Sequence, residues 1–460
     1  MKRNHVKRND VKRNRVKRRG APQGESSDRR GNAMPILEGL AVERFVNAIS
    51  KRGATDLAEV EPAVRRIVGD VRRNGDRAVR RYATRWDGLG KGEALRVPEE
   101  ELHKAWEQTA PELQDAIEQA AGNIRRYAEW QKPEEWQREI QPGVCVGQLV
   151  RPLDSVGCYV PGGRYPLPST LLMTVIPAQV AGVKRICVAS PRPGRVTMAA
   201  AAFLGVREFY RVGGAQAIAA FACGTDEIPR VDKIVGPGNR YVTAAKKLVA
   251  FDCAIEFLAG PTEAVIISNS VSVSENGNND EDGDACCIAS DLLAQAEHDP
   301  DALCIFITTA RALATKVHQE VERRTRSNAI AAQSLSRRGA ILVVDSVAHA
   351  LEAANRIAPE HLTLPAAMAP AVQHAGSVFL GEFTPQAAGD YVSGPNHVLP
   401  TGGMARVRGG LSVLDFVRLI ASQQISREGM QRIAPPGIAL ATAEGLKGHA
   451  EAFRARCSHA

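Results

Sequence analysis

The sequence has no apolar run long enough for a membrane-spanning helix, which needs about 20 predominantly apolar residues in a row. The longest apolar stretch, residues 171–183, is interrupted by Pro177 and Gln179. We therefore expect no membrane span. With 44% hydrophobic and 24% charged residues over 460 positions, the chain has the composition of a globular protein of two or three domains.

The sequence also lacks any Cys-x-x-Cys pair. Its nine cysteines are scattered, and several lie in apolar runs such as Ile186-Cys187-Val188, which is typical of reduced, buried thiols. This spacing fits neither a disulfide framework nor a cysteine zinc site. We therefore expect a reducing, cytoplasmic location.

Two common nucleotide fingerprints are missing as well. No Gly-x-Gly-x-x-Gly follows a predicted strand, and no Gly-x-x-x-x-Gly-Lys-Ser/Thr occurs. Three other Gly-rich turns do follow strand-like runs: Pro161-Gly162-Gly163, Val212-Gly213-Gly214 and Gly236-Pro237-Gly238. Open α/β sheets bind ligands at the carboxyl ends of their strands, and helix N-termini there attract phosphate, so three successive turns favour a nucleotide.

The net charge of +8 is confined to one end of the chain. Residues 1–33 hold twelve Lys and Arg against three acidic residues, and the remaining chain is near neutral, at −1. Lys-Arg-Asn recurs there with few side chains that could support a core, so we expect disorder. Three interpretations stay open: a nucleic-acid-binding arm, a solubilising tail, or an extension upstream of a true start at Met34, where the sequence changes character.

The hydrophobic pattern predicts an α/β fold. Residues 34–131 show helical spacing, and short β-rich runs then alternate with segments of helical length, such as 168–181 and 240–249. The expected strands are residues 156–160, 185–189, 208–212, 233–235, 264–268, 303–308, 340–344 and 377–380. We predict two doubly wound, Rossmann-like parallel-sheet domains joined by a hinge at 258–261, with a helical N-terminal region and a small C-terminal domain.

A few polar side chains stand out as candidates for chemistry. Gln295 and His298 lie three residues apart on a predicted helix and could hold one metal ion, although a surface histidine is the plainer interpretation. The pair Glu360-His361 follows a helix, which suits an acid and a base or an exposed turn. The other candidates are Asp390, His397, Glu444 and His449. Imidazole, carboxylate and amide groups form a set that zinc accepts, but spacing leaves open whether they converge.

Seven motifs, in order and spacing, resemble the histidinol dehydrogenase family. They are Gly157-Cys158-Tyr159-Val160-Pro161-Gly162-Gly163, Gly236-Pro237-Gly238-Asn239, Ala259-Gly260-Pro261-Thr262-Glu263, Gln295-Ala296-Glu297-His298, Pro359-Glu360-His361, Gly389-Asp390-Tyr391 and Asn396-His397-Val398-Leu399-Pro400-Thr401. The resemblance covers roughly residues 36–455. It implies a zinc enzyme that oxidises L-histidinol through L-histidinal to L-histidine with two NAD, the last two steps of histidine biosynthesis.

The resemblance also implies roles for individual residues. Glu360 and His361 would be the acid and base groups. The zinc ligands would be Gln295, His298, Asp390 and His449; the NAD contacts would be Tyr159, Gln216 and Asn239; and the substrate contacts would be Thr262, His361, His397, Glu444 and the zinc ligands. In this family the C-terminal segment crosses to the partner, so Glu444 and His449 would complete the other site of a homodimer.

The implied domains are residues 34–155 with 263–392 for catalysis and zinc, 156–262 for NAD, and 393–460 as the crossing C-terminal domain. Three departures from the family bear on substrate fit: Glu256 where Asp is usual, Thr262 where Ser is commoner, and an acidic loop insertion at 274–283. Arg164-Tyr165-Pro166 is similar to relatives that oxidise other alcohols, including a sulfonated propanediol. A sulfonate needs a cation where Glu444 stands, which favours histidinol.

Overall fold

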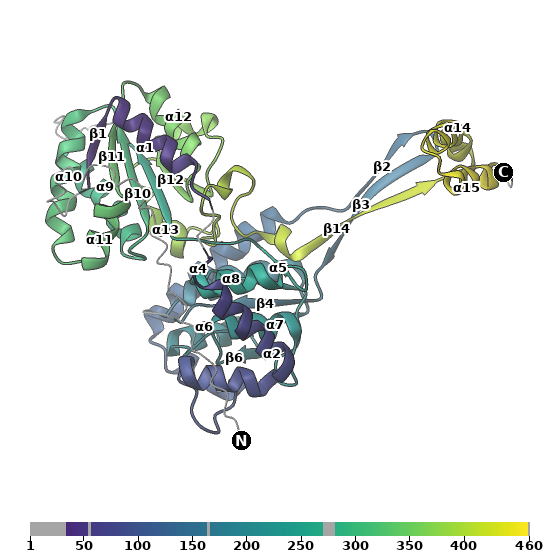
Figure 1. The fold of residues 1–460 in the computed structure, drawn as a ribbon, viewed down its shortest axis with the longest axis horizontal. Helices are drawn as coiled ribbons and strands as arrows, with labels where there is room; N and C mark the ends of the chain where they lie inside the picture. Colours follow the sequence, from purple (N-terminus) through teal and green to yellow (C-terminus); the bar gives the residue numbers. More distant parts are fainter. Residues whose placement is uncertain (1–33, 54–56, 163–165, 270–280, 459–460) are drawn as a thin grey trace, which may run out of the picture.

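The computed structural model describes residues 34–53, 57–162, 166–269 and 281–458. Three sheets form its frame: a six-stranded sheet, a five-stranded sheet, and a three-stranded sheet that carries the C-terminal helices away from both (Figure 1). The expected disorder of residues 1–33 lies outside the described residues, as does most of the acidic insertion. Helix α9 already begins at Glu281, within the expected loop.

The six-stranded sheet is parallel throughout and has helices on both faces. Its strands, in spatial order, are β1 (Ile36–Glu38), β11 (Ala340–Val343), β10 (Leu303–Thr308), β9 (Glu263–Ile267), β12 (His361–Leu364) and β13 (Ser377–Leu380). Its helices are α1 (Leu40–Ser50), α9 (Glu281–Ala296), α10 (Arg311–Thr325), α11 (Ala329–Arg338), α12 (Val347–Ile357), η2 (Ala366–Ala371) and α13 (Gln386–Tyr391). Side chains from α1 and α12 fill one face of this sheet, and side chains from α9, α10 and α11 fill the other.

The five-stranded sheet is also parallel and covered on both faces. Its strands, in spatial order, are β6 (Glu208–Tyr210), β5 (Arg185–Ala189), β4 (Ser155–Tyr159), β7 (Lys233–Val235) and β8 (Ala254–Ile255). Its helices are α2 (Glu61–Tyr82), η1 (Ala83–Asp87), α3 (Glu99–Glu107), α4 (Pro111–Gln131), α5 (Pro168–Ala181), α6 (Arg195–Phe203), α7 (Gly214–Cys223), α8 (Arg240–Val249) and η4 (Val413–Phe416). The short helix η3 (Met404–Arg406) lies beside α12, where Arg406 donates to the carbonyl oxygen of Arg356. The segment 256–262 links the two sheets and includes residues 258–261, for which the sequence predicted a hinge.

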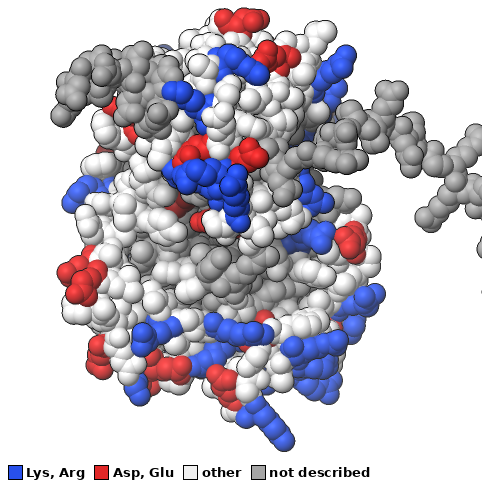
Figure 2. Space-filling view, turned by 90° about the vertical axis from the view of Figure 1, so that its left-hand side faces the viewer, with Lys and Arg blue, Asp and Glu red and all other residues white. Residues whose placement is uncertain are grey.

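Charged side chains of both signs are interspersed over the surface of the body. Figure 2 shows Lys and Arg beside Asp and Glu on the face that lies at the left of Figure 1. This mixture agrees with the near-neutral charge outside residues 1–33. Within the described ranges, no helix is both long and apolar enough to cross a membrane.

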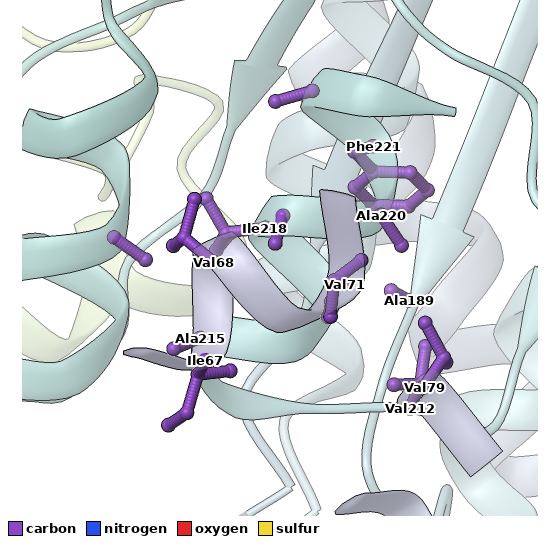
Figure 3. Close-up of a cluster of buried hydrophobic side chains, with 14 of the residues drawn as sticks. Ile67, Val68, Val71, Val79, Ala189, Val212, Ala215, Ile218, Ala220 and Phe221 are labelled. Carbon is purple, nitrogen blue, oxygen red and sulfur yellow. The ribbon is translucent and has the colours of Figure 1, made fainter. Parts of the chain in front are cut away.

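The helical N-terminal region is divided between the two parallel sheets. Strand β1 and helix α1 join the six-stranded sheet, whereas α2 packs on α7 and α8 beside the five-stranded one. Figure 3 shows Ile67, Val68 and Val71 of α2 among the side chains of α7. Helices α3 and α4 pack on α6 and α5. The sequence had grouped residues 34–155 with 263–392, so this division differs from the expectation.

The three-stranded antiparallel sheet forms a long arm that the sequence pattern did not predict. Strand β14 (Val417–Ile425) pairs along its whole length with β3 (Val144–Pro152), and β2 (Trp136–Gln141) pairs with the other edge of β3. The arm ends in α14 (Arg427–Ala443) and α15 (Lys447–Ser458), which pack on each other away from both parallel sheets (Figure 1).

Most of the predicted architecture is confirmed. The α/β class and all eight expected strands are present, and the helices at 168–181 and 240–249 have the expected bounds. Five other strands were not predicted: β1 and β8 are short, β2 and β14 are mostly exposed, and β3 lies between β2 and β14 in the antiparallel sheet. Strand β12 was also missed, since Glu360-His361 was taken for a turn or an element end.

Substitution of Gly236, which directly follows β7, tests the close approach of β4 and β7. Gly236 has φ +111°, and a Cβ there would lie 2.1 Å from the Tyr159 carbonyl oxygen. We expect Gly236→Ala to lower the unfolding free energy by about 2 kcal/mol or more. Gly122→Ala is the control, because Gly122 lies in α4 and, apart from its neighbours and the backbone of its own helix, no described atom lies within 4 Å of its Cβ position. That change should be neutral or stabilising by up to about 1 kcal/mol. Equal denaturation midpoints would contradict this account.

Candidate active site

The candidate active site lies at the amino ends of β9 and β12. Glu360 immediately precedes β12, and His361 is its first residue. On the neighbouring strand, Thr262 precedes β9 and Glu263 begins it. The parallel register pairs His361 with Ala264, so these residues occupy one edge of the six-stranded sheet.

Glu360 is a buried carboxyl group with two nearby donors. Its Oε2 lies 2.7 Å from the Thr262 hydroxyl and accepts from the Glu263 backbone N–H at 2.9 Å. Burial raises the pKa of Glu360, whereas the charge of His361 and these two hydrogen bonds lower it. Burial has the larger effect, so the pKa rises from 4.5 to about 7. The carboxyl group is thus suited to proton transfer near neutral pH.

His361 is buried with one ring nitrogen held and the other unsatisfied. Nδ1 lies 3.2 Å from the backbone oxygen of Glu263, and a carbonyl oxygen can only accept, so Nδ1 carries a proton. Nε2 has no hydrogen-bond partner among the described residues, and Asp390 Oδ1 is 3.7 Å away. Burial opposes protonation, but Glu360 and Asp390 outweigh it and raise the pKa of His361 above 6.5. The neutral ring therefore presents Nε2 as a base.

The Thr262 hydroxyl connects Glu360 with a side chain of α9. It lies 2.7 Å from Glu360 Oε2 and 3.1 Å from Gln295 Oε1. A hydroxyl has one proton, so it cannot donate to both oxygens at once. Both contacts are satisfied if Glu360 is protonated, because its carboxyl O–H then donates to the Thr262 hydroxyl oxygen and the Thr262 O–H donates to Gln295 Oε1.

Asp390 and His397 connect this edge with the five-stranded sheet. Asp390 Oδ2 accepts from Gln295 Nε2 at 3.5 Å, and the Asp390 backbone oxygen lies 2.8 Å from His397 Nδ1. His397 Nε2 lies 3.3 Å from the hydroxyl of Thr170, in the first turn of α5. The carboxyl edge of the five-stranded sheet therefore meets the amino edge of the six-stranded sheet at this site.

The structure brings Gln295 and Asp390 into hydrogen-bond contact, and His298 lies near them. His298 is exposed after the end of α9. Burial raises the pKa of Asp390, but the charges of His361, His397 and His298 outweigh it, so the net shift is downward. In the part of the chain that the structure describes, no three His, Cys, Asp or Glu side chains lie close enough to hold a metal ion. The set within one chain is thus an amide, a carboxylate and a nearby imidazole.

Glu444 and His449 do not join this group within the chain. Glu444 directly follows α14 and His449 lies near the start of α15, and both are exposed at the tip of the arm. Figure 1 shows these helices far from the six-stranded sheet.

The three predicted NAD contacts lie at the carboxyl edge of the five-stranded sheet. The Tyr159 hydroxyl accepts from the N–H of Gly214, and Asn239 accepts from two N–H groups at the start of α8. Gln216 Nε2 donates to Asp87 Oδ2 at 2.9 Å. The N-termini of α7 and α8 thus already have acceptors, which limits their use as pyrophosphate sites.

Asp87 is a residue that the sequence analysis missed. It comes from η1, is buried, and accepts from Gly213 N as well as from Gln216. Burial raises its pKa more than these two hydrogen bonds lower it. Because a carboxylate takes the Gln216 amide hydrogens, the Gln216 carbonyl oxygen is directed elsewhere. In the sequence, the one local signal at Asp87 is its position directly before Gly88, at the end of η1.

Comparisons with known proteins agree on one family. The family model described as histidinol dehydrogenase matches residues 50–457. The histidinol dehydrogenase of Methanothermobacter thermautotrophicus is 44% identical over 426 residues, covering 90% of this chain and 97% of that protein. That of Aquifex aeolicus is 45% identical over 416 residues, covering 89% and 95%. A crystal structure of histidinol dehydrogenase from Elizabethkingia anophelis has a TM-score of 0.85 at 34% identity, covering 93% of this chain and 98% of its own.

The raised pKa of Glu360 makes stability depend on pH. The folded state keeps this proton up to about pH 7, whereas the unfolded chain loses it near 4.5, so unfolding becomes easier as pH rises between these values. Glu360→Gln removes this dependence, because the amide does not titrate. From acidic to alkaline pH, the unfolding free energy of the variant should therefore rise by up to about 3 kcal/mol relative to that of the wild type. The measurement is the unfolding midpoint of both proteins across that range with a metal chelator present. Parallel pH curves would contradict the assignment.

Proposed function

The chain belongs to the histidinol dehydrogenase family of oxidoreductases, and we propose that it oxidises L-histidinol through L-histidinal to L-histidine with two NAD and a bound zinc ion. The observation that carries the proposal is the buried Glu360-His361 pair, in which Nε2 of His361 lies beside Asp390 and finds no partner in the part of the chain that the structure describes.

The donor set fits zinc. Gln295, His298 and Asp390 supply an amide, an imidazole and a carboxylate, to which His449 of a second chain would add an imidazole. The amide nitrogen of Gln295 now faces Asp390. Turning this amide by 180° directs Oε1 to the metal and Nε2 to Thr262, whose hydroxyl then donates to Glu360. Every group in the chain of hydrogen bonds stays satisfied, so the arrangement accommodates the ion.

NAD would lie along the carboxyl edge of the five-stranded sheet. Tyr159, Gln216 and Asn239 lie at this edge, which is where parallel α/β sheets bind nucleotides. This edge meets the acid and base groups through Thr170 and His397. We therefore assign residues 156–262 to NAD and residues 263–392 to zinc and catalysis.

The first oxidation needs a base at the substrate hydroxyl. When bound, zinc would orient the imidazole and amine of histidinol, and NAD would accept the hydride. His361 Nε2 takes the hydroxyl proton, because Glu263 holds the ring with its proton on Nδ1. Burial of His361 and its stacking on Phe379 keep bulk water from the base.

The second oxidation needs water activated at the aldehyde. Glu360 has a pKa of about 7 because it is buried, so it can both take and return a proton near neutral pH. Thr262 holds this carboxyl group from one side and Glu263 N–H from the other. His397 and Glu444 would contact the substrate, with Glu444 facing its cationic amine.

Shared active sites in a homodimer account for the arm. The arm exposes large apolar side chains that a lone chain leaves in water: Trp136, Ile140, Leu419, Ile420, Leu440 and Leu446. A three-stranded ribbon needs a packed face to be stable. A second copy would cover this surface and receive Glu444 and His449.

Two alternatives have weaker support. Oxidation of another small alcohol, such as a sulfopropanediol, rests on Arg164-Tyr165-Pro166, and residues 163–165 lie outside the described residues. Nucleic-acid binding rests on residues 1–33, which also lie outside them. Truncation at Met34 tests the latter: it should abolish salt-dependent binding if the tail is a nucleic-acid arm.

Stoichiometry tests the proposed reaction. We expect two NADH for each L-histidinol consumed, because alcohol and aldehyde are oxidised in turn. Chelation should remove the activity, and added zinc should restore it. A single NADH per substrate, or turnover of another alcohol in place of histidinol, would contradict the proposal.

Mixing two inactive variants tests the shared site. His361→Asn should retain zinc but lose most turnover, whereas His449→Asn should weaken zinc binding. In a heterodimer of the two, one site receives both mutations and the other none. Co-expression should therefore restore about a quarter of wild-type activity, given random pairing in a two-fold dimer.

Each variant expressed alone is the control for this experiment. No recovery in isolated heterodimers, tagged differently on each chain, would contradict a site shared between subunits. Normal zinc content in His449→Asn would contradict its role as a ligand.

A further inference from the structure

The backbone of Glu263 contacts both members of the acid and base pair, while its side chain points elsewhere. Its N–H donates to Glu360 and its carbonyl oxygen lies 3.2 Å from His361 Nδ1. Its carboxylate is buried and pairs with Arg52, just after α1, more than 200 positions earlier in the chain. The placement of both catalytic groups therefore depends on where this side chain is held.

Arg52 holds Glu263 in a bidentate pair. Arg52 Nε lies 2.7 Å from Glu263 Oε1, and one terminal nitrogen lies 2.6 Å from Oε2. Glu263 Oε1 also accepts from the N–H of Gly402 at 3.0 Å, which attaches the segment that follows His397. Two parallel bonds fix direction as well as distance, which a single contact cannot do.

The other side of the Arg52 guanidinium holds the chain that leads into Glu360. Arg52 donates to the carbonyl oxygens of Ile357 at 2.7 Å and Ala358 at 3.4 Å. Ala358 has φ +51°, one of two positive values among the non-glycine residues that the structure describes. It also precedes Pro359, which further restricts its backbone. Such a conformation persists only where surrounding contacts enforce it.

We propose that Arg52 is a positioning residue for catalysis: it clamps Glu263 on one side and the Ile357–Ala358 turn on the other, and so sets the geometry of Glu360 and His361. The proposal rests on the proposed function, in which these two groups transfer protons. The name Arg52 clamp is used below for Arg52, the Glu263 side chain and the two carbonyl groups.

Stability alone is a poor explanation for a buried pair of this kind. Replacing both members of a buried ion pair by apolar groups of similar size is often neutral for stability, whereas removing one leaves an unpaired buried charge. The double variant Arg52→Met/Glu263→Met avoids that unpaired charge. It also leaves the backbone contacts of Glu263 chemically intact, so it tests placement.

Four variants test the Arg52 clamp in the full-length, zinc-loaded protein. They are Arg52→Lys, Arg52→Ala, the double Met variant, and Arg80→Ala as a control. Arg80 makes a similar forked pair with Glu227 and donates to the carbonyl of Glu93, but its side chain is 39% exposed and lies in α2, beside the five-stranded sheet. Zinc content and the denaturation midpoint are measured for each.

We expect kcat to fall about 100-fold in the double variant, the loss that a misplacement of about 1 Å can cause, with KM for histidinol changed far less. Arg52→Lys should lie between it and the wild type, because a single ammonium cannot hold both sides. Guanidinium ion should restore turnover in Arg52→Ala but not in His361→Asn. Arg80→Ala should match the wild type.

The proposal is overturned if the folded, zinc-loaded double variant keeps its kcat, or if guanidinium restores nothing in Arg52→Ala. Hydrogen exchange provides a test that needs no turnover. In the double variant, exchange should quicken in peptides spanning 258–266 and 356–364 and at Gly402, whose N–H loses its Glu263 acceptor, and not in peptides remote from the Arg52 clamp. If the wild type fails to oxidise histidinol, the proposed function fails. Hydrogen exchange then still tests the Arg52 clamp: unchanged exchange in these peptides of the double variant overturns it, and faster exchange supports it.

Discussion

The backbone of a single residue, Glu263, contacts both the proposed acid group and the proposed base. Its N–H donates to Glu360, and its carbonyl oxygen fixes the proton of His361 on Nδ1. Because a carbonyl group cannot donate, Nε2 of the neutral ring keeps its lone pair. Burial adds the second condition, since it raises the pKa of Glu360 to about 7 and brings its proton exchange close to neutral pH. The proposed chemistry requires both conditions together.

Three parts of the fold contribute residues to the proposed site at the amino edge of the six-stranded sheet. The six-stranded sheet supplies Thr262, Glu360 and His361 at strand ends, where neighbouring backbone holds them. The five-stranded sheet approaches with its carboxyl edge, and Thr170 and His397 mark the contact. The arm carries Glu444 and His449 away from both parallel sheets, so the proposed zinc ligands do not all lie together in one chain, which is the reason for the proposed dimer.

Local sequence patterns predicted those parts of the structure that depend on residues close together in the chain. Apolar β-rich runs identified all eight expected strands, and ordered motifs identified the family. Strand β14 could not be predicted in this way, because its residues are mostly exposed and only pairing with β3, over 260 positions away, makes them a strand. Arg52 and Asp87 escaped for the same reason: each acts through a partner distant in sequence, and neither lies in a recognisable motif.

The tautomer of His361 tests the central claim most directly. Neutron diffraction of the deuterated protein at alkaline pH locates the exchangeable atom on the imidazole ring. This account predicts deuterium on Nδ1, directed at the Glu263 carbonyl oxygen, and none on Nε2. Deuterium on Nε2 with a bare Nδ1 would contradict it, because the ring would then have no base to offer the substrate hydroxyl.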